Sequence, residues 1–380
     1  MKITRIETLI ADNGNNNAVY VRTHTDAGVH GVGEAYRVGP DRATAEWVSY
    51  FAEQLVGRDP TEIERNWALC YQGTRFPLGS SALAALSGID QSLWDIAGKA
   101  VNMPVYELLG GRVRDRIRAY HGVHADSPQK LAEAGRKLVQ GEGFTALKTS
   151  PLPDNWRDLT WNQAVDGGKR LMEALRRAVG GDTDIGLDAH AAVWEPARAL
   201  ELADALAEFK PFFMEEPLRM ENRREMGLLR RKMPFALATG ECLYTKFELG
   251  ELIREEAVDI LQPDVCIVGG MTELRKIAFN AEAHDLTVAP HNPLGPLATV
   301  VNLHFDAATT NFLIQEYRTA SESEAATVTK APKPVDGYFP LPEGPGWGVD
   351  IVEAAIKARP MKRNWHRGDR TYPDGAIAYI

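Results

Sequence analysis

Eight short apolar runs follow one another along the chain, and their spacing constrains the fold more than any other feature. From about residue 116 onward, each run alternates with a stretch of helical character, and most of the later runs lie roughly 23 to 28 residues apart. That distance accommodates one strand, one helix and two loops. Eight parallel strands with helices between them make a TIM-like barrel. The runs are Ile117–Tyr120, Thr145–Lys148, Ile185–Asp188, Phe212–Glu215, Ala236–Glu241, Ile260–Gln262, Thr287–Ala289 and Phe312–Gln315.

A doubly wound open sheet is the alternative arrangement for such a pattern. It is disfavoured because no GxGxxG or GxxxxGK[ST] phosphate loop follows any of the runs. The flanking parts of the chain differ from the barrel pattern. The first part predicts strands at 3–10 and 18–25 and then helices, of which 82–100 has the clearest apolar periodicity. The last 50 or so residues are rich in Pro and Gly and predict loops and a returning segment.

Six successive runs end in an acidic residue or a histidine. In a barrel of this kind the carboxyl ends of the strands meet at one face, where catalytic residues collect. A charged side chain directly after a buried strand is costly unless it is paired or bound to a metal. The pattern therefore predicts a site at that face, formed by Asp188, Glu215, Glu241, Asp264, His291 and Glu316.

Three of these carboxylates, Asp188, Glu215 and Glu241, close consecutive strands. Such a cluster is self-repulsive unless a divalent cation joins it, and all-oxygen ligands suit Mg²⁺ better than Zn²⁺. The sequence therefore predicts one Mg²⁺ per subunit. Strand alternation predicts that Glu216 and Cys242 point away from this cluster.

Two histidines are candidates for proton transfer. His190 lies two residues after Asp188, on the same face of an extended segment. His291 ends the seventh run, beside Asp264 at the end of the sixth. A carboxylate against an imidazole fixes its tautomer and strengthens it as a base. One histidine could take a proton while the other gives one.

Composition excludes several classes of function. The net charge of −9, from 43 Lys+Arg and 52 Asp+Glu, argues against nucleic acid as a partner. Only three cysteines are present, too few for a disulfide framework. We find neither a signal peptide nor a membrane span, so we expect a cytoplasmic protein with no membrane partner.

The motifs as an ordered set resemble the enolase superfamily, in its mandelate racemase/muconate lactonizing enzyme branch. Within that branch the chain is most similar to acid-sugar dehydratases of the D-galactonate dehydratase type, mainly because His190 follows Asp188 in a D-x-H pattern. The resemblance extends almost from end to end of the chain. It includes GIDQSLWDIAGKAVNMPVYELLGG at 88–111, then GLDAH, MEEP, TGE, QPD, GGMTE, APHNPLGP and IQE, and GPGWGVD at 344–350.

The resemblance implies a (β/α)₇β TIM-like barrel with an α+β capping domain. It places the cap at 1–116, the barrel at 117–330 and a segment completing the cap at 331–380. It also implies Mg²⁺ on the three carboxylates, His291 with Asp264 as the base and His190 as the general acid. Glu316 would hydrogen-bond the carboxylate end of the substrate. Members of the family are commonly homo-oligomers, which we expect here as well.

One departure concerns the second strand. Many racemases and cycloisomerases of the branch carry Lys-x-Lys there, whereas this chain has Lys148 followed by Ser150. The missing lysine weakens a two-base racemase interpretation, and Lys148 would assist electrostatically. Loops of the cap and of the first strand would supply substrate specificity. The candidate substrate-binding residues are Asn13, Tyr71, Arg75, His121 and His124.

We therefore expect a Mg²⁺-dependent dehydratase that converts an aldonic or aldaric acid to its 2-keto-3-deoxy product. The alternatives are a cycloisomerase or epimerase of a sugar-derived acid on the same scaffold, and a metal-binding scaffold without turnover.

Overall fold

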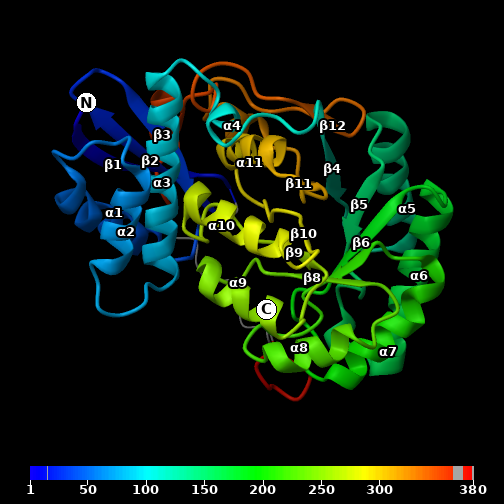
Figure 1. Cartoon of the computed structure of the whole chain (residues 1–380). Coiled ribbons are helices and arrows are strands. Elements are labelled where there is room, and N and C mark those ends of the chain that lie inside the picture. Colours follow the sequence, from blue (N-terminus) through cyan, green and yellow to red (C-terminus); the bar gives the residue numbers. More distant parts are fainter. Residues whose placement is uncertain (15, 363–370, 379–380) are drawn as a thin grey trace.

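The computed structural model describes residues 1–14, 16–362 and 371–378, and its larger sheet contains eight parallel strands (Figure 1). Neighbouring strands pair in chain order from β4 to β10, and β11 pairs in parallel with β4. The strands are β4 (Arg116–Gly122), β5 (Ala146–Thr149), β6 (Asp184–Asp188), β7 (Phe213–Glu215), β8 (Ala236–Thr239), β9 (Ile260–Leu261), β10 (Thr287–Val288) and β11 (Gln315–Tyr317).

The segment that leads into β11 closes the sheet into a barrel. Val288 of β10 donates its N–H to the Asn311 carbonyl at 3.0 Å and accepts from the N–H of Leu313 at 2.8 Å. The eighth predicted run, Phe312–Gln315, therefore contains this closing contact, and the regular strand begins only at its last residue. Closure removes both edges of the parallel sheet.

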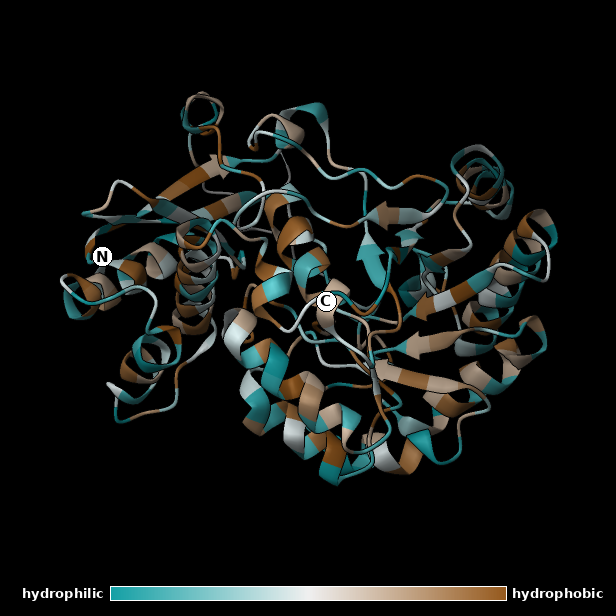
Figure 2. Cartoon of the chain, turned by 45° about the horizontal axis from the view of Figure 1, so that its top comes forward, coloured by the Kyte–Doolittle hydropathy of each residue, from teal (hydrophilic) through white to brown (hydrophobic). Residues whose placement is uncertain are grey.

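Seven helices connect the eight strands, which confirms the predicted (β/α)₇β barrel. Each helix buries an apolar stripe against the sheet, and Figure 2 shows both hydrophobic and hydrophilic segments along them. The helix α6 begins at a capping box, in which the Thr160 hydroxyl and the Gln163 side chain bond each other's backbone N–H. The connecting helices are α5 (Pro128–Arg136), α6 (Trp161–Val179), α7 (Pro196–Leu206), α8 (Arg223–Arg230), α9 (Thr245–Arg254), α10 (Gly270–Glu282) and α11 (Pro296–Ala308).

A separate antiparallel sheet and three helices form the predicted α+β cap at the amino-terminal side (Figure 1). Gly31 and Gly33 let β3 lie directly against α3, because a Cβ atom at either position would meet a backbone carbonyl of that helix at 2.0 to 2.2 Å. The elements are β1 (Ile3–Asp12), β2 (Asn17–Thr25), β3 (His30–Ala35), α1 (Asp41–Leu55), α2 (Ile63–Gln72) and α3 (Ser80–Ala100), followed by α4 (Val105–Leu108).

The carboxy-terminal part of the chain returns to both units. Strand β12 (Tyr338–Pro340) pairs antiparallel with β4, and α13 (Glu353–Lys357) lies beside β1. The buried Trp347 donates its indole N–H to the Val32 carbonyl of β3 at 2.9 Å. A short helix, α12 (Glu322–Ala325), precedes this segment. The exact division of the chain at residues 116 and 330 stays a prediction. Within the described residues, no helix is long and apolar enough to cross a membrane.

Candidate active site

The centre of the site is an ion cluster around Lys148, which lies at the end of β5. Its ammonium Nζ is 3.0 Å from Asp188 Oδ2, 2.8 Å from Glu215 Oε2 and 2.8 Å from Glu316 Oε1. All four side chains come from the carboxyl ends of barrel strands, as the polar residues after the apolar runs predict. The structure thus brings three of the predicted site acids onto one cation.

Charge compensation within this cluster decides the protonation of its members. Burial disfavours the ammonium, but the facing carboxylates hold the pKa of Lys148 well above its ordinary value. Burial likewise opposes the charged form of Asp188 and Glu316, whose pKa values Lys148 nevertheless lowers. Burial and the nearby Asp188 raise the pKa of Glu215, so one cation does not compensate all three acids.

Glu241, after β8, extends the acidic row beyond Glu215. Burial, followed by the charges of Glu216 and Glu215, raises the pKa of Glu241 well above its ordinary value. The Oε1 atom of Glu215 is buried without a hydrogen-bond partner among the described residues. A buried, unsatisfied carboxylate oxygen beside a second acid is the environment that a dication stabilises. The donor set Asp188, Glu215 and Glu241 therefore fits a hard divalent cation.

His291 and Asp264 form a hydrogen-bonded pair at the ends of β10 and β9. His291 Nδ1 lies 2.9 Å from Asp264 Oδ2, and Asp264 Oδ1 accepts the Cys266 N–H at 2.7 Å. His291 Nε2 faces Glu241 Oε2 at 3.2 Å. Burial opposes the imidazolium, but the hydrogen bond to Asp264 and the charge of Glu316 raise the pKa of His291. The pair therefore holds an imidazole of increased basicity with Nε2 directed at the carboxylate row.

His190 lies at the other end of that row. Its backbone N–H donates to Asp188 Oδ1 at 3.1 Å, and its ring Nδ1 is 3.3 Å from the same oxygen. The residue adopts φ 47°, a left-handed conformation stabilised by that turn. Its side chain is 61% exposed. Unlike the buried His291, it can therefore exchange protons with solvent as well as with a bound ligand.

Asp188, His190 and Glu241 of this site line a cavity of about 1040 Å³. Of the predicted substrate-binding residues, His124 lines it. His121 packs against Phe144 and Tyr317 instead, and Tyr71 stacks on Trp67 at 4.8 Å. Neither these two nor Asn13 and Arg75 are among the described residues that line the cavity, and their contact with substrate stays a prediction.

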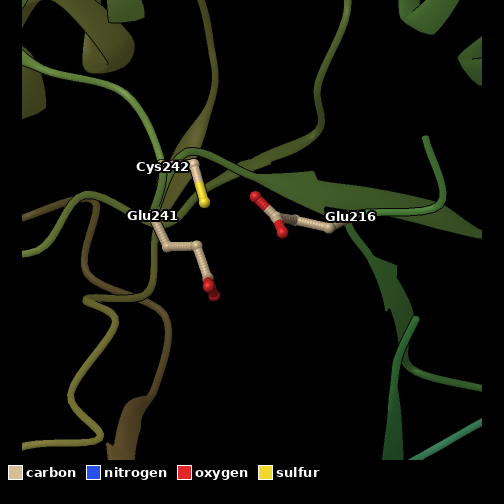
Figure 3. A group of neighbouring side chains, drawn as sticks. All are labelled: Glu216, Glu241 and Cys242. Carbon is tan, nitrogen blue, oxygen red and sulfur yellow. The ribbon is translucent and has the colours of Figure 1, made fainter. Parts of the chain in front are cut away.

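Sequence reasoning missed several residues that line the cavity. Strand alternation predicts that Glu216 and Cys242 point away from the carboxylate cluster, but both line the cavity beside it. The reason is backbone conformation: Glu216 has φ 41° and so leaves the strand alternation. Figure 3 shows their side chains turned toward one another beside Glu241. Tyr36 of the cap and the loop 150–158 after β5 also line the cavity, together with Thr371 and Ala378.

Three hydrogen bonds between the cap and the barrel place Tyr36 beside the His291–Asp264 pair. The Tyr36 N–H donates to the Cys266 carbonyl at 2.9 Å, and the buried Glu34 carboxylate accepts the N–H groups of Gly295 and Ala298 at 3.1 and 2.9 Å. The Tyr36 ring lies 6.2 Å from the His291 ring. No local sequence pattern signals this residue, because its position depends on how the cap docks on the barrel.

Comparison with known proteins agrees with this fold and site. Residues 4–110 match the family model described as mandelate racemase / muconate lactonizing enzyme, N-terminal domain, and residues 130–355 match enolase C-terminal domain-like. The D-galactonate dehydratases of Ralstonia nicotianae and Variovorax paradoxus are each 36% identical, with all of both chains covered. A solved enolase from Agrobacterium radiobacter, a candidate galactarate dehydratase with bound Na and L-malate, is 40% identical, with full coverage of both chains and a TM-score of 0.95.

The fold and the acidic site thus define an enolase-type barrel enzyme. The chain belongs to the mandelate racemase / muconate lactonizing enzyme branch of the enolase superfamily. Within that branch it is a dehydratase, a carbon–oxygen lyase.

Proposed function

We propose that this dehydratase removes water from a galactonate-like acid sugar, an aldonate or an aldarate, to give a 2-keto-3-deoxy acid with Mg²⁺ as cofactor. The observation that carries the proposal is the placement of two histidines against opposite ends of one row of carboxylates. His190 contacts Asp188 at one end, and His291 contacts Glu241 at the other. Dehydration needs such a pair, because one carbon loses a proton while the next loses a hydroxyl group.

The relatives support the substrate class. The curated relatives named above are D-galactonate dehydratases. A solved enolase from Pantoea ananatis holds D-gluconate and Mg, is 27% identical, covers 99% of both chains and has a TM-score of 0.92. Asp188, Glu215 and Glu241 would hold the ion here. Mg²⁺, when bound, supplies positive charge that stabilises an enediolate.

The chain's own residues then divide the proton transfers. His291 Nε2, oriented through Nδ1 by Asp264, takes the proton from the carbon next to the substrate carboxylate. His190 donates a proton to the departing β-hydroxyl, which leaves as water. Lys148 stabilises negative charge at the carboxylate end of the substrate, and Glu316 Oε1 holds the Lys148 ammonium at 2.8 Å. The enol that remains tautomerises to the 2-keto acid.

A cycloisomerase or epimerase is less well supported by the residues near Lys148. Ser150, at the position of the second lysine, bonds within its own turn through the Leu152 backbone. A racemase of the two-lysine type therefore lacks one of its bases on this strand.

The proposal is tested by assaying the purified protein with Mg²⁺ against a panel of C5 and C6 aldonates and aldarates. We expect formation of a 2-keto acid from at least one galactonate-like member, and loss of this product when EDTA removes the metal. The His190→Ala variant is expected to retain solvent-deuterium exchange at the α-carbon while losing dehydration. Absence of product across the whole panel would contradict the proposal, as would isotope exchange without water loss in the unmodified enzyme.

Replacement of Tyr36 by Phe tests whether the cap contributes to substrate binding. Burial, and then the charges of Asp264 and Glu241, raise the pKa of Tyr36, so its hydroxyl remains a donor. Loss of one hydrogen bond of 0.5–1.5 kcal/mol predicts a fall in kcat/KM of roughly 3- to 10-fold, mostly through KM. Tyr106→Phe, on the distant α4, is the matched control and should leave kcat/KM unchanged. Equal kinetics in the two variants would exclude a substrate contact for Tyr36.

A further inference from the structure

Glu216, Glu241 and Cys242 form a second cluster of possible metal ligands beside the row that we assign to Mg²⁺. One ligand atom of each residue lies within 4.8 Å of the other two. Figure 3 shows the Cys242 sulfur directed at the Glu216 carboxylate, with the Glu241 side chain next to it. The residues come from the ends of two neighbouring strands, β7 and β8.

The Glu216 carboxylate is unusual in being buried without full compensation. The residue is 3% exposed, and its Oε1 atom has no hydrogen-bond partner in the part of the chain that the structure describes. One of its carboxylate oxygens lies within 4.8 Å of the Cys242 sulfur. Cys242 is exposed and lines the cavity, so a cation that enters from solvent reaches the sulfur directly. The remaining two cysteines, Cys70 and Cys266, are buried.

We propose that Glu216, Glu241 and Cys242 bind a thiophilic divalent cation, of which Zn²⁺ and Cd²⁺ are the chemical examples. Thiolate sulfur selects borderline and soft cations over Mg²⁺, and two carboxylates with one thiolate leave a fourth tetrahedral position for water. On binding, the sulfur–metal bond replaces the S–H bond, and the proton passes to solvent. The ligand atoms lie close enough together that side-chain rotation brings them to bonding distance.

This second site shares Glu241 with the Mg²⁺ site, and the functional consequence rests on the proposed function. When the Glu241 carboxylate binds a cation beside Cys242, it is withdrawn from the Asp188–Glu215 pair and from His291. Occupancy is therefore expected to inhibit the dehydratase, and Mg²⁺ in excess is expected to oppose the inhibition. Metal binding itself does not depend on whether the enzyme dehydrates an acid sugar.

Cadmium titration of the chelator-treated full chain tests the binding. We expect an ultraviolet thiolate-to-cadmium charge-transfer band that saturates at one Cd²⁺ per chain. The band should disappear in Cys242→Ser and persist in Cys70→Ser, the matched control at a buried thiol of α2. Glu216→Gln should keep the band but weaken Cd²⁺ affinity by about tenfold or more, since loss of even an outer-shell partner of a metal ligand costs that much. A band of full intensity in Cys242→Ser would overturn the proposal.

An activity measurement tests the shared ligand. Inhibition by Zn²⁺ is measured at fixed Mg²⁺, with each variant scaled to its own uninhibited rate. We expect the inhibitory concentration to rise at least about tenfold in Cys242→Ser and to stay unchanged in Cys70→Ser. Equal inhibition of both variants would overturn the shared site. An enzyme that dehydrates no acid sugar but loses the cadmium band in Cys242→Ser would contradict the proposed function and support the metal site.

Discussion

Replacement of His291 by Asn is expected to lower kcat by about 10²- to 10⁴-fold, the usual contribution of a general base. The Asn side-chain amide can donate a hydrogen bond to Asp264, as the imidazole Nδ1–H does, but it cannot take a proton. Asp264 holds Nδ1 at 2.9 Å, so that Nε2 faces the carboxylate row at 3.2 Å from Glu241. Substrate binding should change far less than kcat, since the ring acts on the proton and not on the carboxylate.

Isotope exchange separates loss of the base from general damage to the site. In His291→Asn, solvent deuterium should no longer enter the α-carbon, whereas in His190→Ala it should continue to do so. His284→Asn is the matched control, because that histidine is exposed and its ring bonds the Asn280 carbonyl one helical turn earlier. If His291→Asn exchanged deuterium at the rate of this control, another residue would be the base.

The barrel and most of its polar centre could be predicted from sequence for a physical reason. Parallel strands that alternate with helices bring their carboxyl ends to one face, so residues such as Lys148 and Glu316 meet although 168 residues separate them. The spacing of the apolar runs can be read locally in the sequence, yet it predicts the barrel and therefore which distant residues lie close together. The same signal predicts the row of acids after β6, β7 and β8.

The rest of the site depends on features without a local signal. Glu216 enters the cavity because its backbone adopts a positive φ, which strand alternation does not anticipate. Tyr36 reaches His291 only through docking of the cap, fixed by the buried Glu34 on the backbone of residues 295–298. Thr371 and Ala378 come from the far end of the chain. Such contacts are set by packing between units, where sequence patterns are least informative.

Lys148 has a larger part in the site than the sequence indicated. It is the cation against which three buried carboxylates are arranged, at 2.8 to 3.0 Å. Removal of one partner from a buried ion cluster leaves uncompensated charge, at a cost of about 3–5 kcal/mol. The Lys148 ammonium and a divalent cation neutralise some of the same acids. Each therefore reduces the stabilisation that the other provides.

Lys148→Met is therefore expected to destabilise the metal-free enzyme by about 3–5 kcal/mol and to make its stability depend more strongly on Mg²⁺. Met keeps the apolar stem of the side chain and removes only the charge. The measurement is thermal and urea denaturation with and without Mg²⁺, and the rise in Tm on adding Mg²⁺ should be larger in the variant than in the unmodified chain.

Lys169→Met is the matched control, since Lys169 pairs with Glu208 at 2.9 Å on the surface, with side-chain exposures of 40% and 61%. An exposed pair contributes only about 0–1 kcal/mol, so this variant should show a small loss that Mg²⁺ does not recover. If both variants lost equally little stability without Mg²⁺, the acids around Lys148 would be protonated in the folded chain. If Lys148→Met lost stability but gained nothing extra from Mg²⁺, the ion would bind where the charge of Lys148 is not felt, which would contradict a site on Asp188 and Glu215.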